Sequence, residues 1–304
     1  MDELREACAL VAARAGSVSI VSGAVHAYAA TPSAGAVSPS LPVPPGTPAE
    51  REARAAYWLT MDAINFGSGW FPTLRKRPGV SGYTTIATAL EDQFRDGAWS
   101  AADLTRMTAA GLGPALGQDP DHELMALYAT SLRDLGEHVI AGYDGHFAAV
   151  VDAAGGSAVS LARCLGRWAS FADCSRYGDI EIPFLKRAQI AAADLARAGV
   201  VEFADLHRLT MFADNLVPHV LRLDGVLRFD SELAGRIARE ELIDHGSDEE
   251  VEIRACAVHA VELVVAASPP PHPTAARLDQ ILWQRGQQPQ YKASPRHRSR
   301  CTAY

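Results

Sequence analysis

Signals for the start and end of helices recur along the whole chain, whereas alternating patterns of apolar and polar residues are scarce and short. Residues 2–14 already place apolar side chains at helical spacing, and similar patterns follow toward the C-terminal region. The one convincing extended segment is "DIEIPF", residues 179–184, whose proline is typical of a strand edge or boundary. The sequence therefore predicts a mostly α-helical fold.

Several helix boundaries can be placed from capping residues. Thr47, Pro48 and Glu50 combine a capping hydroxyl, a proline at the first helical position and an acid that closes a capping box. The helix that they begin should run to about Asn65, where glycines 67 and 69 end it. Further starts are expected at Ser100 with Asp103, at Asp119–Pro120 and at Ser247 with Glu250, and further ends at Gly111, Gly142 and Gly199.

The length and the apolar content favour one folded body. A chain of 304 residues with 48% hydrophobic residues can bury one large core, and no repeat of fixed period is present. We expect a single compact multi-helix domain over residues 1–304, with a proline-rich surface connector at residues 31–48 and a basic C-terminal tail at residues 286–304. This tail contains no acid, and it is either solvated or folded back onto acidic helices.

The charge balance and the cysteines narrow the classes of function. With 28 basic and 36 acidic residues the chain is mildly acidic, which disfavours direct binding of nucleic acid through broad electrostatics. The five cysteines form no C-x-x-C pair, so we expect a reducing, cytoplasmic environment. No apolar run reaches the roughly 18 residues of a membrane span, and no histidine pattern typical of a metal site occurs. We therefore expect neither a metal site nor a membrane partner.

An acid and an amide stand within an apolar helical segment, "LTMDAINFGSGWF" at residues 59–71. Asp62 and Asn65 are three residues apart, and they share a predicted helical face with Trp58. A buried carboxylate or amide costs free energy unless a partner satisfies it, so either the fold or a ligand must supply that partner. The two side chains are therefore candidates for a binding site.

Five segments, in order along the chain, resemble the queuosine salvage family, whose members are hydrolases that release the modified base queuine from queuosine 5'-monophosphate. These segments are "DAINFGSGW", "FLKRAQIAAADL", "LTMFADNLVPHVL", "EEVEIRACAVHAVELV" and "PRHRSRCTAY". The resemblance implies a small-molecule substrate and a helical fold akin to the helix-hairpin-helix DNA glycosylases. It also implies an enzyme that uses no metal and no cofactor.

The reaction of this family would need a carboxylate and a cation. Breaking an N-glycosidic bond builds positive charge on the ribose and negative charge on the departing base. Asp214 in "MFADNLVP" is the first catalytic candidate, because backbone donors where the chain enters a helix would keep it ionised; an ordinary helix cap is the alternative. Lys186 is the second, since a 7-deazaguanine lacks the ring nitrogen that glycosidases usually protonate; a surface lysine beside Arg187 is the alternative.

Recognition of the base calls for flat apolar faces and a hydrogen-bonding edge. Phe66, Trp70 and Phe212 can sandwich a heterocycle, although such rings are more often part of a core. The polar candidates for substrate binding are Asp62, Asn65, Glu252 and His259.

Two of the assignments leave a structural alternative open. Glu252 and His259 lie on one stripe of a mostly apolar helix, where they can line a site or join a core network with Arg254 or a tail arginine. The 5'-phosphate calls for cations, and the tail arginines Arg298 and Arg300 are the candidates. A purely structural tail is the alternative for both arginines.

Two other functions compete with this interpretation. The segment "RPGVSGYTTIATAL" from Arg77 resembles the glycine hairpin of DNA glycosylases, and in that case the catalytic acid should lie near Asp103. The acidic charge balance argues against it. A non-enzymatic helical adaptor is the other competitor, and it would place a set of polar side chains on its exterior, namely Asp62, Asn65, Lys186 and Asp214.

Overall fold

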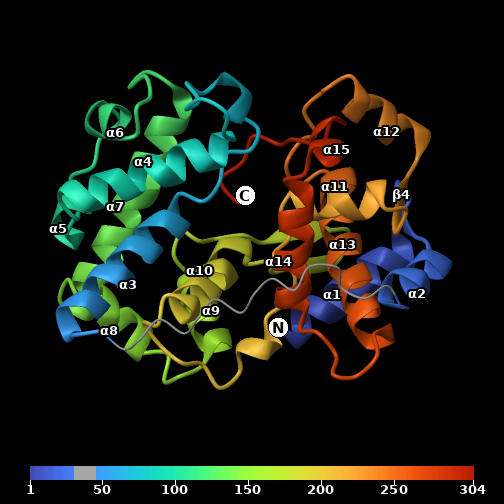
Figure 1. The fold of residues 1–304 in the computed structure, drawn as a ribbon, viewed down its shortest axis with the longest axis horizontal. Coiled ribbons are helices and arrows are strands. Elements are labelled where there is room, and N and C mark those ends of the chain that lie inside the picture. Colours follow the sequence, from blue (N-terminus) through green and yellow to red (C-terminus); the bar gives the residue numbers. More distant parts are fainter. Residues whose placement is uncertain (31–45) are drawn as a thin grey trace. The chain divides into compact units, whose positions relative to one another are not determined.

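Helices form most of the regular structure in the described residues, which are 1–30 and 46–304 of the computed structural model (Figure 1). Strands make only two short sheets of two strands each there. The predicted mostly α-helical fold is confirmed. Most of the predicted proline-rich connector, residues 31–48, lies outside the described residues.

The chain divides into two compact units, and each unit is assembled from segments that are far apart in the sequence. The first unit takes the described residues of Met1–Pro39, together with Asp173–Lys186 and His207–Arg300. The second unit takes the described residues of Ser40–Ala172, together with Arg187–Leu206 and Cys301–Tyr304. The single domain expected over residues 1–304 stays a prediction.

In the first unit, the central element is helix α13 (Asp248–Ala267), whose side chains are buried on almost every side. A helix that is apolar around most of its circumference is typical of a protein interior. The helices packed against it are α1 (Asp2–Arg14), α2 (Ser22–Ala30), α11 (Leu216–Leu223) and α14 (Ala275–Gly286). The unit also contains α12 (Ser231–Ala238) and α15 (Pro289–Lys292).

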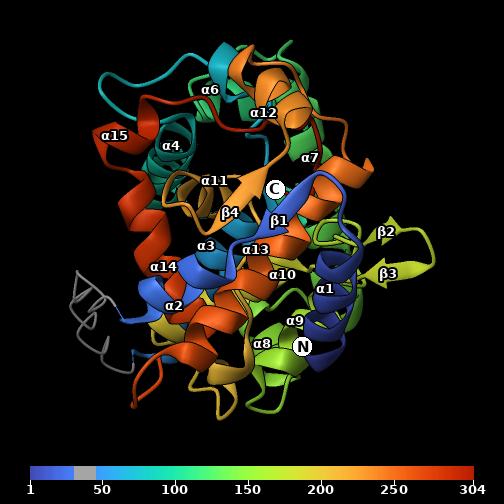
Figure 2. The same cartoon turned by 90° about the vertical axis from the view of Figure 1, so that its right-hand side faces the viewer.

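Both sheets of the described residues belong to the first unit, and both are antiparallel (Figure 2). Strand β1 (Val18–Ile20) pairs with β4 (Leu227–Phe229), and β2 (Ser175–Tyr177) pairs with β3 (Ile180–Ile182). Strand β3 lies inside the segment 179–184, so the predicted extended conformation is confirmed.

In the second unit, the long helix α7 (Glu123–Tyr143) is the central element. The helices packed against it are α3 (Pro48–Ala63), α5 (Ala101–Leu104), α6 (Ala109–Ala115) and α8 (Phe147–Asp152). The close approach of α5 depends on Gly136, because a Cβ there would lie 2.7 Å from the carbonyl oxygen of Ala101. The remaining helices are η1 (Phe71–Thr73), α4 (Gly82–Asp96) and α9 (Ala158–Leu165). Helix α10 (Lys186–Arg197) belongs to this unit from Arg187 onward, and η2 (Leu206–Arg208) spans the passage back to the first unit.

The predicted helix starts are mostly confirmed. Thr47 and Glu50 form a reciprocal capping box at the start of α3, and Ser100 and Asp103 form another at the start of α5. Ser247 caps α13 by accepting from the amide of Glu250. The start expected at Asp119–Pro120 is displaced, because α7 begins at Glu123 with the His122 side chain as its cap.

The predicted helix ends are less accurate. Helix α3 ends at Ala63 and α10 at Arg197, close to the glycines expected to end them. The ends expected at Gly111 and Gly142 are wrong, since Gly111 lies inside α6 and Gly142 inside α7. The turn that ends α7 is made by Asp144 in the left-handed conformation, with φ 52°.

Candidate functional site

Asp214 lies immediately before α11 and caps its first turn. Its Oδ1 atom accepts hydrogen bonds from the amides of Leu216, at 2.9 Å, and Val217, at 3.0 Å. These are the backbone donors expected where the chain enters a helix. Both bonds go to Oδ1, and the Asp214 residue is only partly buried.

A second carboxyl group, Asp279 on α14, lies in the electrostatic field of Asp214. Asp279 is 6% exposed, and its Oδ1 accepts a hydrogen bond of 3.1 Å from the amide of Phe212. Burial raises the pKa of Asp279 well above its ordinary value, and the negative charge of Asp214 raises it further, against the opposing effects of the Phe212 amide and Lys186. Burial and the charge of Asp214 therefore both favour the protonated form of Asp279.

Lys186, the first residue of α10, belongs to the same group of charges. Its side chain is buried, with the residue 5% exposed, and its positive charge acts on Asp279. The alternative of a surface lysine is therefore wrong. The structure thus brings together Asp214, Lys186 and the backbone of Phe212, and it adds Asp279, which the sequence interpretation did not select.

A cation from the C-terminal tail lies near Asp214 as well. Burial lowers the pKa of Arg296, whereas the carboxylate of Asp214 acts in the opposite direction. The Nε atom of Arg296 is buried, and no acceptor for it exists among residues 1–30 and 46–304. A buried guanidinium donor without an acceptor is a candidate contact for an anionic ligand.

The two tail arginines expected to bind phosphate have other surroundings. Arg298 places Nη1 3.5 Å from the exposed carboxylate of Glu240, and its carbonyl accepts from the amide of Ile243. Arg300 is exposed. These observations do not test phosphate binding, so the roles of Arg298 and Arg300 stay predictions.

Glu252 and His259 lie on α13 of the first unit, as expected. The Glu252 carboxylate accepts hydrogen bonds of 2.7 to 2.9 Å from the amides of Gly16, Ser17 and Val18, and one of 2.8 Å from the Tyr177 hydroxyl. These partners differ from the core network with an arginine that the sequence offered as the alternative, and binding of substrate by Glu252 stays a prediction. His259 is half-buried, and burial lowers its pKa.

Asp62 and Asn65 lie at the C-terminal end of α3, in the second unit. Asp62 is fully buried, and its Oδ1 accepts a hydrogen bond of 3.2 Å from the Asn65 amide group. The buried Asp62 carboxylate therefore has the side-chain amide of Asn65 as one of its hydrogen-bond partners. Tyr83 lies in the field of this carboxylate. Burial raises the pKa of Tyr83 most, and the negative charges of Asp194 and Asp62 raise it further.

Phe66 and Trp70 are buried in the second unit. The Phe66 ring, 2% exposed, contacts the Tyr128 ring edge-on at 4.9 Å, and the Arg187 guanidinium lies 4.9 Å from its centre. The Trp70 indole donates to Glu123 at 2.7 Å. These contacts match the alternative of core residues, and stacking of either ring on a base stays a prediction.

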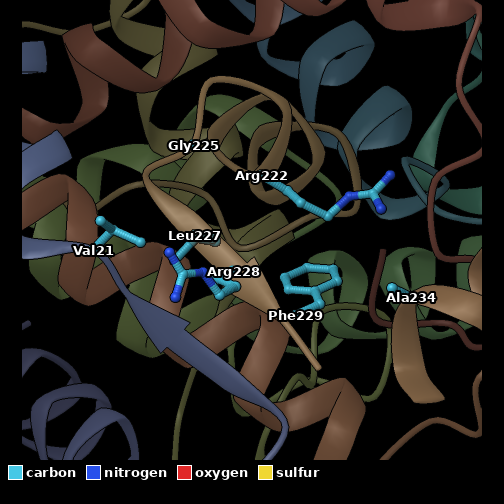
Figure 3. Close-up of a pocket in the computed structure, with 7 residues that line it drawn as sticks. All are labelled: Val21, Arg222, Gly225, Leu227, Arg228, Phe229 and Ala234. Carbon is cyan, nitrogen blue, oxygen red and sulfur yellow. The ribbon is translucent and has the colours of Figure 1, made fainter. Parts of the chain in front are cut away.

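One pocket of about 330 Å³ lies in the first unit at the end of α11 away from Asp214 (Figure 3). Its lining is Val21, Arg222, Gly225, Leu227, Arg228, Phe229 and Ala234. None of the predicted site residues lies in it. Within the described ranges, no group of three or more His, Cys, Asp or Glu is arranged to hold a metal ion, and no helix has the length and apolar content that a membrane crossing requires.

The family model described as "Queuosine salvage protein" matches residues 46–304, which is most of the chain and includes every candidate residue named above for the acid, lysine and tail. This chain belongs to the queuosine salvage protein family.

Proteins named "Queuosine 5'-phosphate N-glycosylase/hydrolase" are similar to it. One from Sphaerobacter thermophilus is 36% identical over 84% of this chain and 82% of its own length. One from Bos taurus is 27% identical over 99% of this chain and 98% of its own length, and one from Dictyostelium discoideum is 29% identical over 82% and 77%. These alignments cover most of each relative as well as most of this chain.

Proposed function

We propose that this protein is an N-glycoside hydrolase that releases queuine from queuosine 5'-monophosphate. Membership of the queuosine salvage family and the names of the relatives support this function. The observation on this chain that carries the proposal is the Asp214 carboxylate, which two backbone amides hold at the start of α11, in the electrostatic field of the buried Asp279 and Lys186. A fixed carboxylate facing a ribose stabilises the developing oxocarbenium ion more than the ground state.

In the proposed reaction, Asp214 acts on the sugar and on water. The bond between the anomeric carbon and the base nitrogen breaks, and an oxygen atom from water forms the new bond to that carbon. Asp214 stabilises the positive charge through Oδ2 and accepts a proton from the attacking water. Its other oxygen stays bound to the amides of Leu216 and Val217, which keep the carboxylate in place.

Asp279 and Lys186 meet the charge on the departing base. A 7-deazaguanine cannot be protonated at the position that its missing nitrogen would occupy, so donors must act elsewhere on the ring. Burial raises the pKa of Asp279 and so favours its protonated form, which we assign as the donor that passes a proton to the base, while Lys186 supplies a positive charge. The proton received by Asp214 then replaces the one that Asp279 gave, and the balance of protons closes.

Arg296 extends the proposed phosphate site. Its buried Nε has no hydrogen-bond acceptor within the described residues, and its guanidinium interacts electrostatically with Asp214. Both observations favour Arg296 as an anchor for the 5'-phosphate, in addition to Arg298 and Arg300. We retain Asp62, Asn65, Phe66, Trp70, Phe212 and His259 as proposed contacts of the base and its side arm.

The structure argues against both competing functions, a DNA glycosylase and a non-enzymatic adaptor. Asp103, the acid expected for a DNA glycosylase, is exposed and closes the capping box with Ser100. An adaptor would expose its polar groups, yet Asp62 and Lys186 are buried. We therefore propose a small-molecule substrate without direct binding of nucleic acid. We also propose a cytoplasmic location and, from the family resemblance, a fold akin to the helix-hairpin-helix DNA glycosylases.

The test is to incubate the purified protein with queuosine 5'-monophosphate and to follow free queuine by chromatography. Queuosine nucleoside and duplex DNA with a damaged base serve as parallel substrates. We expect queuine from the monophosphate and no base from DNA. If neither the monophosphate nor the nucleoside releases queuine, the proposed function is wrong.

A further inference from the structure

A buried ion pair in the first unit touches the backbone at both candidate catalytic residues. Arg254 on α13 and Asp173, which precedes β2, have fully buried side chains. The Nη2 atom of Arg254 donates to both carboxylate oxygens of Asp173, at 2.9 and 2.7 Å. Neither residue has a role in the proposed reaction, and each makes a further contact toward the site.

On the acid side, the pair holds the start of α10. Oδ2 of Asp173 accepts a hydrogen bond of 2.9 Å from the amide of Lys186, and the backbone carbonyl of Asp173 accepts one of 3.1 Å from the amide of Leu185. Leu185 has φ 51°, in the left-handed region that a side chain disfavours. Such a conformation persists where surrounding contacts over-determine it, so Asp173 sets the direction in which Lys186 leaves the backbone.

On the arginine side, the pair holds the chain at Asp214. Nε of Arg254 donates to the carbonyl oxygen of Ala213 at 2.9 Å, and this carbonyl carbon is bonded to the amide nitrogen of Asp214. The Phe184 ring supports the guanidinium plane from 4.0 Å. The planar fork of arginine makes the contacts with Ala213 and Asp173 at the same time, which an ammonium group cannot do in this geometry.

We propose that Arg254 and Asp173 are a positioning pair, which fixes the backbone at Asp214 and at Lys186 in one geometry for catalysis. This inference rests on the proposed function. A buried ion pair is often no more stabilising than apolar residues of the same volume, so stability alone does not explain its presence, although removal of one partner destabilises the fold. Catalytic groups lose much of their effect when they are displaced by as little as 1 Å.

The experiment compares Asp173→Asn with a matched control, Asp224→Asn. Asp224 is a largely buried carboxylate of the first unit, whereas Asp173 is fully buried, and it pairs with Arg285 at 2.8 Å, outside the proposed machinery. Both variants are assayed with queuosine 5'-monophosphate below their melting temperatures, and kcat and KM are determined separately. We expect kcat of Asp173→Asn to fall about 10²-fold with KM within about threefold of wild type, and Asp224→Asn to keep both constants within about threefold.

The outcomes separate this inference from the proposed function. A wild-type protein that releases no queuine overturns both. An active wild type with kcat unchanged in Asp173→Asn, or reduced equally in the control, overturns the positioning pair alone. If Asp173→Asn does not fold, Phe184→Leu decides: it removes the ring face under Arg254 and keeps an apolar side chain, so kcat should fall about tenfold, and an unchanged kcat overturns the inference.

Discussion

At the residue scale, Asp214 binds the start of α11 through Oδ1, and this contact allows its capping role and its catalytic role to be separated. Asp214→Asn removes the negative charge, yet the amide oxygen can still accept from Leu216 and Val217. We expect the variant to fold and to bind queuosine 5'-monophosphate, with kcat reduced about 10³-fold. Turnover and calorimetric binding measure the two effects, and near wild-type turnover would assign the reaction to another carboxylate.

Arg296 gives a test of phosphate recognition. Arg296→Met removes the buried donor near Asp214, and we expect KM for the monophosphate to rise by about 10- to 100-fold, as for a lost charged hydrogen bond. Arg228→Met is the control, because Arg228 is an exposed arginine on β4. Activity on the nucleoside should change little in either variant. An equal loss on nucleoside and monophosphate would show that Arg296 does not read the phosphate.

The candidate site was predicted only in part, for reasons that lie in single residues. Asp214 and Lys186 stand in recognisable segments, so the sequence indicated them. Asp279 was missed because "ARLDQILW" reads as an ordinary amphipathic helix, in which an acid is expected on the exposed face. The pair of Asp173 and Arg254 was missed because 81 residues separate its members and only the folded chain brings them together.

At the scale of elements, Glu252 links α13 to the chain before β1 and to Tyr177 on β2. Glu252→Gln removes the charge that attracts three backbone amides, so we expect a loss of about 2 kcal/mol in the free energy of unfolding, with KM unchanged. Urea denaturation and steady-state kinetics provide the two readouts. A raised KM with unchanged stability would instead place Glu252 in the substrate site, as the sequence predicted.

A buried histidine on α11, His219, makes the stability of the first unit sensitive to acid. His219 on α11 donates through Nε2 to the carbonyl of Tyr291 at 2.8 Å, and burial lowers its pKa to about 4. Because this folded-state pKa lies below the unfolded value of 6.5, the stabilising contribution is complete above pH 6.5 and is lost as the pH falls through 4.

The size of this effect can be measured with His219→Gln, which cannot gain a proton. Between pH 7 and pH 4, the wild type should lose about 2 to 3 kcal/mol more unfolding free energy than the variant, since each pKa unit corresponds to about 1.4 kcal/mol. Urea denaturation at both pH values gives the difference. Parallel pH profiles for the two proteins would show that His219 is not the group that titrates.

The same scale shows why helix starts were easier to predict than helix ends. A capping box such as Thr47 with Glu50 satisfies backbone donors with its own side chains, so the local sequence is sufficient. Gly111 and Gly142 remain helical because glycine permits a left-handed turn without requiring one. Where α7 ends is decided instead by Asp144, which adopts φ 52°.

At the scale of the whole molecule, the sequence predicted the helical class but not the division of the chain. Helical periodicity is a local property, whereas the two units are assembled from segments that alternate along the chain. The passage from one unit to the other falls within α10. The amide of Lys186 is held by Asp173 in the first unit, and the next residue, Arg187, donates to the carbonyls of Ala63 and Ser170 in the second.

This shared helix predicts that the two units unfold together. Loss of either unit releases one anchor of α10, which the other unit needs, so the free energies of unfolding should be coupled. Four tryptophans, Trp58, Trp70, Trp99 and Trp168, lie in the second unit, and Trp283 lies in the first. In Trp283→Phe, fluorescence therefore follows the second unit alone, while far-ultraviolet circular dichroism follows the helices of both. Coincident urea transitions are expected, as for one cooperative domain over residues 1–304, whereas a fluorescence midpoint clearly separated from the dichroism midpoint would show two domains that unfold independently.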